Sequence, residues 1–236
     1  MDVTLSQSHA LSLPQAYAIQ AAVTAARLAR GERVVGWKLG YTSLAMREQM
    51  GIAQPNFGPL TDAMLLDDGE AIPFGMQPRV EPEIALRLGR RLRGPATTEQ
   101  ALAACSTALA CLEVVDSVWT GYRFTLEDNT ADGSSASFVV VGGAVPMDDL
   151  AGLAVTFHAA GERVDSATGA AAGGHPAAGV AWLAGQLALR GEALHKGDLV
   201  ITGGLVAARP LVPGGLMSAR FGGDVEVSVR RLAADA

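Results

Sequence analysis

The sequence predicts a mixed α/β protein built around one large core. Apolar, strand-like runs cover residues 79–86 and 108–115, and the β-branched and aliphatic residues of the second run predict a buried strand. Alanine-rich helical segments separate such runs, and glycine-rich turns punctuate the strands of the last third. A chain of 236 residues, 49% hydrophobic and 18% charged, has the composition of a globular protein. We therefore expect a single domain over residues 1–236.

Local signals place the first elements. Proline near its start and glycine at its end suit a helix over residues 13–30. A strand over residues 34–40 follows, and a short helix over residues 44–50 can be capped by the hydroxyls just before it. Prolines and glycines mark residues 54–62 as an ordered loop. The first 70 residues are thus expected to be a largely helical part that packs on the strands.

The later elements alternate in the same way. A polar, turn-rich segment over residues 120–137 can present hydroxyls and backbone amides to a ligand. The expected helices span residues 97–104 and 176–190, and the expected strands span residues 138–141, 153–158, 162–165, 198–202 and 225–231.

Charge and hydropathy narrow the class of partner. A net charge of −6 argues against a nucleic-acid surface. No apolar run reaches the roughly 18 residues that a membrane span requires, and the first residues lack the basic start and apolar core of a signal peptide. We expect a cytoplasmic protein that binds a small molecule.

The histidines and cysteines form no site motif. The two cysteines, Cys105 and Cys111, lie near apolar residues without metal-ligand or redox spacing, so we expect buried, non-catalytic thiols. The four histidines are scattered, without the spacing of metal ligands.

Three glutamates stand out because they lie inside apolar, strand-like runs. Glu81 and Glu83 are two residues apart, so an extended backbone projects both from one face, and Glu113 lies in the next such run. Burying an ionised carboxylate without a partner costs on the order of several kcal/mol, which favours a bound cation. Oxygen ligands suit Mg²⁺ or Mn²⁺. The alternative is that Glu81 and Glu83 face solvent on an edge strand, while Glu113 pairs with an arginine such as Arg79.

Lys38 is the second unusual charge, since it stands in the apolar run over residues 34–40. Gly36 and Gly40 flank it and allow other backbone to approach this strand closely. The alternative is a surface lysine whose aliphatic stem packs on the protein while its ammonium reaches solvent.

Four short segments carry a family resemblance. They are Gly36-Trp37-Lys38-Leu39-Gly40-Tyr41-Thr42-Ser43, Arg79-Val80-Glu81-Pro82-Glu83-Ile84-Ala85, Leu112-Glu113-Val114-Val115-Asp116-Ser117 and Ala131-Asp132-Gly133-Ser134-Ser135. In order and separation they resemble the hydratase/decarboxylase branch of the fumarylacetoacetate hydrolase superfamily. The similarity spans nearly the whole chain.

The resemblance implies a fold and a metal site. The fold would be a β-roll with flanking helices, forming one catalytic domain. Mg²⁺ or Mn²⁺ would be held by Glu81, Glu83 and Glu113. Lys38 would be a catalytic group beside the metal-bound end of the substrate, with Asp62 as a further candidate.

The substrate-binding residues are assigned on the same grounds. Ser134 and Ser135 would hold a carboxylate through their amides and hydroxyls, and Asp132 would support them. Asn56 would lie near the substrate from the loop over residues 54–62.

Two enzyme types share this scaffold, namely hydratases of 2-hydroxydienoates and decarboxylases of 2-oxo-3-enedioates, as in the meta-cleavage pathway for aromatic compounds. The segments Gly174-His175-Pro176 and Thr202-Gly203-Gly204 resemble the decarboxylases. Asn56 stands where hydratases typically have an aspartate, and an amide cannot act as a base.

We therefore predict a lyase that decarboxylates a 2-oxo-3-enedioate of the 4-oxalocrotonate type to a 2-hydroxydienoate. Such a substrate is a vinylogous β-keto acid, and the divalent ion would serve as the electron sink. The alternative is hydration of 2-hydroxypenta-2,4-dienoate or a related 2-oxo acid. A carbon–carbon hydrolase would need a histidine base near the metal. The resemblance also implies a homo-oligomer and association with a paired hydratase; an inactive partner subunit is disfavoured by the intact acids.

Overall fold

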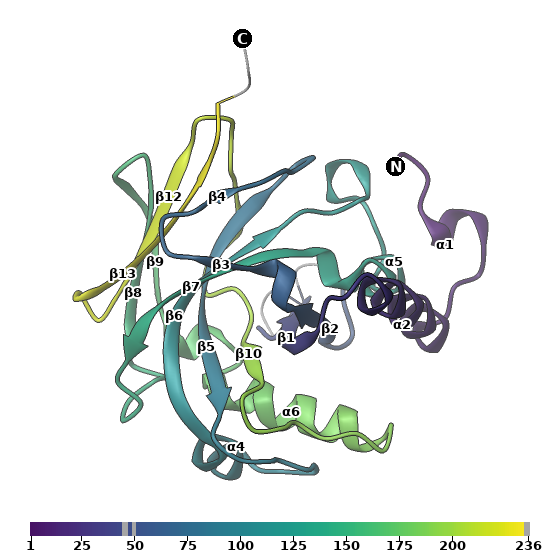
Figure 1. Cartoon of the computed structure of the whole chain (residues 1–236), viewed down its shortest axis with the longest axis horizontal. Helices are drawn as coiled ribbons and strands as arrows, with labels where there is room; N and C mark the ends of the chain where they lie inside the picture. Colours follow the sequence, from purple (N-terminus) through teal and green to yellow (C-terminus); the bar gives the residue numbers. More distant parts are fainter. Residues whose placement is uncertain (44–46, 49–50, 234–236) are drawn as a thin grey trace.

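The computed structural model describes residues 1–43, 47–48 and 51–233, so most of the helix expected over residues 44–50 lies outside the described residues. The described chain forms two β-sheets flanked by helices (Figure 1). Its helices are α1 (Leu5–Ser8), α2 (Leu13–Ala29), α4 (Thr98–Ala104), α5 (Leu126–Ala131) and α6 (Pro176–Ala188), with short 3₁₀ turns η1 (Asp62–Met64), η2 (Thr120–Tyr122), η3 (Gly133–Ser135) and η4 (Gly169–Ala171).

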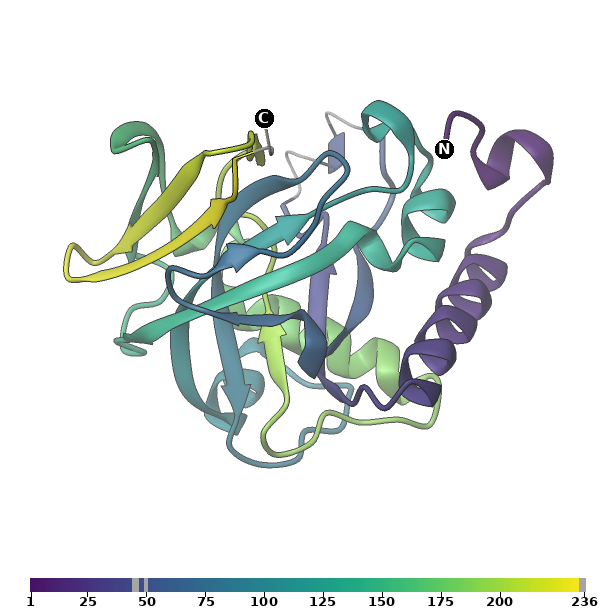
Figure 2. The same cartoon turned by 45° about the horizontal axis from the view of Figure 1, so that its top comes forward.

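The larger sheet has the order β2-β1-β10-β5-β6-β7-β3, and β11 pairs with β5 at one end. Its strands are β1 (Val34–Gly40), β2 (Asn56–Thr61), β3 (Leu65–Asp67), β5 (Arg79–Leu88), β6 (Cys105–Val115), β7 (Ala136–Val145), β10 (Leu199–Ile201) and β11 (Arg209–Pro210). β1 and β10 run parallel, whereas β5 and β6 form a long antiparallel pair. The sheet curls into a half-barrel, which confirms the expected mixed α/β fold (Figure 2).

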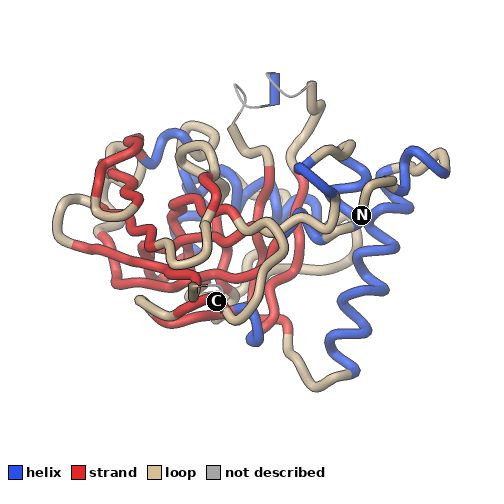
Figure 3. Tube along the Cα trace, turned by 90° about the horizontal axis from the view of Figure 1, so that it is seen from above, coloured by secondary structure: helices blue, strands red, loops and turns tan. Residues whose placement is uncertain are grey.

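The smaller sheet packs against the outside of β6 and β7. Its order is β4-β13-β12-β8-β9, with strands β4 (Ala71–Ile72), β8 (Ala154–Ala159), β9 (Glu162–Thr168), β12 (Leu216–Phe221) and β13 (Val225–Arg231). Helix α6 contacts α4 and β5, and α2 contacts α5. Seen from above, the strands fill one side of the molecule and α2 lies at the opposite end (Figure 3).

Side-chain alternation gives β5 two different faces. Val80 and Ile84 point into the main apolar core, which also contains residues of α6. Ala85 points the other way, into a smaller apolar cluster on the inner face of the curled sheet. Because the alternation has a period of two, Glu81 and Glu83 share the face of Ala85. The inner face is therefore apolar towards one end of β5 and acidic towards the other.

The first 70 residues are less helical than expected. They supply α1 and α2, but also β1, β2 and β3 of the larger sheet. The segment expected as a loop over residues 54–62 contains β2, an edge strand, where Pro59 is tolerated because only one side of the strand needs partners. Strand β12 had not been predicted either.

None of the helices in the described part of the chain combines the length and apolar character that crossing a membrane requires.

Candidate active site

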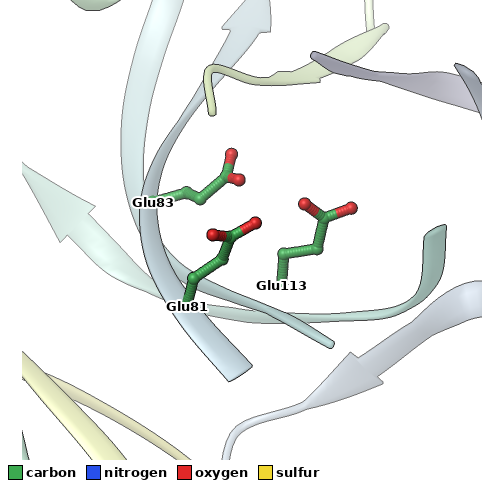
Figure 4. Close-up of side chains that lie close together, drawn as sticks. All are labelled: Glu81, Glu83 and Glu113. Carbon is green, nitrogen blue, oxygen red and sulfur yellow. The ribbon is translucent and has the colours of Figure 1, made fainter. Parts of the chain in front are cut away.

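Three glutamates converge on the inner face of the larger sheet (Figure 4). Glu81 and Glu83 project from β5, and Glu113 projects from its neighbour β6. In the antiparallel register, Glu81 lies directly opposite Glu113. Strand pairing therefore brings Glu113 to the same face on which alternation along β5 places Glu81 and Glu83. One carboxylate oxygen from each residue lies within 4.8 Å of the other two. This spacing suits three oxygen ligands of one small cation.

The carboxylates are short of hydrogen-bond donors. Glu83 and Glu113 are fully buried. Among the described residues, Glu83 Oε1 and Glu113 Oε2 accept no hydrogen bond, and Glu113 Oε1 faces the ammonium of Lys38. Burial, followed by the charge of Glu113, raises the pKa of Glu81 to about 8 and that of Glu83 well above its ordinary value. A bound divalent cation would satisfy these oxygens and remove the repulsion. The residues present therefore fit a hard metal ion.

The alternative arrangements of these charges are wrong. β5 lies between β10 and β6 in the interior of the sheet, so Glu81 and Glu83 do not face solvent from a sheet edge. Glu113 pairs with Lys38 and not with Arg79, since Lys38 Nζ lies 3.0 Å from Glu113 Oε1. Lys38 is only 3% exposed, which excludes a surface lysine.

Lys38 connects the acids to the segment that carries Ser134. Its ammonium donates a hydrogen bond to the Ser134 carbonyl oxygen at 2.8 Å, in addition to the ion pair with Glu113. Burial alone would lower the pKa of Lys38, but the three glutamates outweigh burial and raise the pKa above its ordinary value. The side chain therefore stays charged. An ammonium has three donors, so one remains for an oxygen atom in the adjacent cavity.

The loop after β10 adds a contact that the sequence analysis did not assign to the site. The amide of Gly203 donates a hydrogen bond to Glu83 Oε2 at 2.7 Å. A Cβ on Gly204 would collide with Glu81 Oε2, so glycine allows the loop to pass this close without displacing that carboxylate. The only signal was the family resemblance of Thr202-Gly203-Gly204.

Asn56 belongs to a closed hydrogen-bond network behind Ser134. Its Oδ1 accepts from Ser134 Oγ at 2.9 Å, and its Nδ2 donates to Asn129 Oδ1 and Thr130 Oγ1 at 3.0 Å each. The side chain is fully buried and does not line the cavity. The structure therefore gives no support to direct substrate binding by Asn56, because its polar atoms are used to position Ser134.

Asp132 lies behind Ser135 in a similar way. Its Oδ2 accepts hydrogen bonds from Ser135 Oγ at 3.2 Å, Ser117 Oγ at 3.4 Å and the Val118 amide at 3.3 Å. Burial raises its pKa to about 6. Asp132 does not line the cavity beside the glutamates, so it orients Ser135 and does not contact a ligand there.

Asp62 is not part of this site. It begins η1 beyond the last residue of β2, whereas Asn56 is the first residue of that strand. Its carboxylate forms an ion pair with Arg33 at 3.0 Å near the surface. The structure therefore gives no support to a catalytic Asp62, because the extended strand carries it away from the glutamates.

A cavity of about 330 Å³ opens beside Glu81 and Lys38. Ser134 and Ser135 line it, and their role in binding substrate stays a prediction. Both serines have positive φ angles, 59° and 56°, in a backbone region that residues other than glycine rarely adopt. The Ser134 hydroxyl donates its proton to Asn56, and the Ser135 hydroxyl donates its proton to Asp132. Towards the cavity, these hydroxyl oxygens can therefore act only as hydrogen-bond acceptors.

Other lining residues had not been predicted as site residues. They include the aromatic residues Tyr41, Tyr122 and Phe124 and the cation Arg79. No histidine is present among the described residues that line the cavity, so the base that a carbon–carbon hydrolase would need is not found there.

A half-barrel whose inner face holds three acidic residues and a buried lysine defines a class of α/β protein with a potential metal centre. The family model described as fumarylacetoacetate (FAA) hydrolase C-terminal matches residues 34–234. The chain belongs to this family, as the four sequence segments indicated.

Similar proteins fall into both enzyme types of the family. The chain is 37% identical over 226 residues to a 4-oxalocrotonate decarboxylase of Pseudomonas sp. (strain CF600), covering 93% of this chain and 86% of that protein. It is 37% identical over 211 residues to a 2-hydroxyhexa-2,4-dienoate hydratase of Comamonas testosteroni, covering 86% and 79%. The structure of 4-oxalocrotonate decarboxylase from Pseudomonas putida G7, complexed with magnesium and adipate, superposes with a TM-score of 0.90 at 33% identity, covering 94% and 86%.

Proposed function

We propose that this protein is a divalent-metal-dependent lyase that decarboxylates a 2-oxo-3-enedioate of the 4-oxalocrotonate type to a 2-hydroxydienoate. The observation that carries the proposal is the cluster of Glu81, Glu83 and Glu113, whose unsatisfied oxygens lie beside a charged lysine in a ligand-sized cavity. Relatives named as decarboxylases support it.

The three glutamates would hold the ion, and Mg²⁺ or Mn²⁺ is the proposed species because all three ligands are hard oxygen atoms. When bound, a divalent ion polarises the oxygen atoms of a 2-oxo acid and so favours the loss of CO₂ from the far end of the conjugated chain. The glutamates act as ligands in this scheme, so none is needed as a proton acceptor.

Lys38 would bind the 2-oxo acid end of the substrate. Its remaining donor faces an oxygen that becomes more negative as the carbon–carbon bond breaks, which stabilises the transition state more than the ground state. The ion pair with Glu113 and the hydrogen bond to Ser134 hold the ammonium in place before substrate arrives. Ser134 and Ser135 would shape the wall of the cavity around this end.

The choice between decarboxylase and hydratase depends on proton-transfer groups. A hydratase must move a proton to carbon and activate a water molecule, whereas Asn56 is an amide in a closed network. Hydration of 2-hydroxypenta-2,4-dienoate or a related acid is the second candidate, because hydratases are found among the similar proteins. Purified protein with Mg²⁺ and 2-oxohex-3-enedioate should release CO₂ and accumulate the dienoate. Rapid hydration of the dienoate without CO₂ release would favour the hydratase.

Asn56→Asp tests this choice directly. The carboxylate cannot donate to Asn129 Oδ1 as the amide does, so we expect a loss of about 1–3 kcal/mol in the free energy of unfolding. We expect at most a weak gain of hydratase activity, since a water molecule must also be positioned. Chemical denaturation and the hydration assay measure the two effects. Gln54→Glu, an exposed substitution nearby, is the control for added charge. Efficient hydration by Asn56→Asp would show that residue 56 alone separates the two activities.

Gly204→Ala tests the proposed ligand arrangement. The new methyl would collide with Glu81 Oε2, which lies at the end of a flexible side chain, so the fold should survive while the carboxylate is displaced. We expect Mg²⁺ affinity to fall at least tenfold, by analogy with the loss of other groups that orient metal ligands. Calorimetric titration and thermal melts give both quantities. Gly185→Ala is the matched control, because nothing lies within 4 Å of a Cβ at that site in α6. Wild-type affinity in Gly204→Ala would remove Glu81 from the ligand set.

The remaining expectations are also proposals. One apolar core contains residues from both sheets and from α4 and α6, which supports a single catalytic domain. A second cavity of about 820 Å³, bordered by the exposed side chains of Val23, Phe74 and Met76, supports assembly into a homo-oligomer. Association with a paired hydratase is proposed on the family resemblance alone, and a cytoplasmic location is proposed on the hydropathy of the sequence.

A further inference from the structure

A second cation lines the cavity. Arg79 precedes Glu81 by two residues on β5, so strand alternation places both side chains on the inner face. The guanidinium lies over the ring of Tyr122, 4.1 Å from its centroid. Within the described part of the chain, this ring contact is the only interaction found for the Arg79 guanidinium, which forms neither an ion pair nor a hydrogen bond. A guanidinium has five N–H donors, so Arg79 retains its full capacity to bind an anion.

Asp116, which directly follows the last residue of β6, forms no ion pair with Arg79. Asp116 follows Val115, the residue paired with Arg79 across β5 and β6. However, its two carboxylate oxygens accept hydrogen bonds from the amides of Met76 at 2.7 Å and Gln77 at 2.8 Å. These bonds keep the Asp116 carboxylate directed at the backbone, so the positive charge of Arg79 is left for the cavity.

Tyr122 is held as a rigid support for the guanidinium. Its hydroxyl donates to the carbonyl oxygens of Val115 at 2.9 Å and Gln77 at 3.2 Å. Its backbone has φ 60°, an unfavourable conformation for a tyrosine, which the surrounding contacts must maintain. A ring fixed in this way limits the rotamers of Arg79 and lowers the entropy lost when an anion binds.

We propose that Arg79 binds the distal carboxylate of the substrate and so selects dicarboxylates over monocarboxylates. This inference rests on the proposed function, which puts the 2-oxo acid end at the glutamates and Lys38. Two residues along a strand span about 7 Å, which matches the reach of a six-carbon chain from one carboxyl group to the other. Bidentate pairing with a carboxylate is the interaction for which guanidinium geometry is best suited.

The assignment makes a kinetic prediction. The distal carboxylate is the group that leaves as CO₂, so an ion pair with it stabilises the ground state at least as much as the transition state. Removing Arg79 should therefore raise KM for the enedioate by about 10- to 100-fold, with a much smaller change in kcat. A purely structural role for Arg79 would instead lower kcat or the amount of folded protein.

Binding of unreactive acids tests the proposal without turnover. With Mg²⁺ present, we expect wild type to bind adipate, a six-carbon dicarboxylate, at least about 10-fold more tightly than hexanoate, its monocarboxylate counterpart, by calorimetry. Arg79→Met should abolish this preference by weakening adipate binding alone, while Mg²⁺ affinity and the melting temperature stay near wild type. Arg79→Lys, which keeps the charge without the bidentate geometry, should retain part of the preference for adipate over hexanoate.

Arg87→Met is the matched control, since Arg87 lies near the other end of β5 and outside the cavity. Retention of the adipate preference in Arg79→Met, or no preference in wild type, would overturn the assignment and leave the proposed decarboxylation standing. An Arg79-dependent adipate preference in a wild-type protein that releases no CO₂ from the enedioate would support the subsite and refute the proposed reaction. If Arg79→Met proves unfolded, Arg79→Lys decides, because unchanged adipate preference in that variant contradicts a bidentate subsite.

Discussion

Glu83→Gln should remove tight Mg²⁺ binding and nearly all decarboxylase activity while leaving the fold intact. Glu83 supplies one of three converging ligand oxygens, and an amide oxygen is a neutral and weaker ligand for a hard ion. Replacing a group that merely orients a ligand typically costs 10- to 100-fold in affinity, so we expect a loss of at least about 100-fold here. Calorimetric titration with Mg²⁺ and CO₂ release measure the two effects on the same preparation.

The same substitution should stabilise the metal-free protein at alkaline pH. The folded-state pKa of Glu83 is raised, so between the ordinary pKa and the raised one the folded protein holds a proton that the unfolded chain releases. Stability of the metal-free wild type should therefore fall as pH rises through this window. Glutamine does not titrate and removes this contribution, so the variant should melt at an equal or higher temperature at pH 8.

Glu226→Gln is the control, because Glu226 lies on the surface of the smaller sheet and pairs with Arg220. It should change neither metal affinity nor activity. If Glu83→Gln kept the wild-type Mg²⁺ affinity and turnover, the metal hypothesis would be contradicted. Unfolding of the metal-free variant would show that Glu83 has a structural role.

The strands that build the site could be predicted because they carry strong local patterns. The apolar runs of β5 and β6 were recognised, and α6 differs from its expected end by only two residues. Strand β2 was missed because prolines and glycine usually break strands, whereas an edge strand tolerates them. Strand β12 does carry a signal, since Met217, Ala219 and Phe221 alternate with more exposed residues, but it is short and follows a glycine-rich turn.

The site itself could be predicted only in part from the sequence. Alternation placed Glu81 and Glu83 on one face, yet Glu113 reaches them only through the register of β5 against β6. Such a register depends on contacts far apart in the chain and is not encoded in a local window. Asp62 was misplaced for the same reason, because a loop was expected where an extended strand separates it from Asn56.

The residues that line the cavity were even harder to predict from the sequence. The Gly203 amide and Tyr122 come from loops whose course depends on tertiary packing. Arg79 had been considered only as an ion-pair partner for Glu113. The sequence shows that Arg79 lies two residues before Glu81 and so on the same face of the strand. It does not show that Arg79 lacks an acidic partner.

Lys38→Met should lower kcat by about 100- to 1,000-fold while Mg²⁺ binds as tightly as in wild type, or more tightly. The ammonium is assigned to the substrate and not to the ion, and a positive charge 3.0 Å from Glu113 repels a metal ion that the glutamates attract. Its removal also leaves Glu113 without its counter-ion, which should destabilise the metal-free protein by about 3 kcal/mol. Saturating Mg²⁺ should restore most of that loss, because the ion replaces the missing charge.

Thermal melts with and without Mg²⁺, together with steady-state kinetics, separate these effects. The exposed Lys196, the other lysine of the chain, provides the control variant Lys196→Met, which should match wild type in every measurement. Loss of Mg²⁺ affinity in Lys38→Met would place the ammonium in the structural support of the metal site. Unchanged kcat would exclude Lys38 from contact with the reacting end of the substrate, and the charge that develops there would then have to be stabilised by the glutamate-bound ion alone.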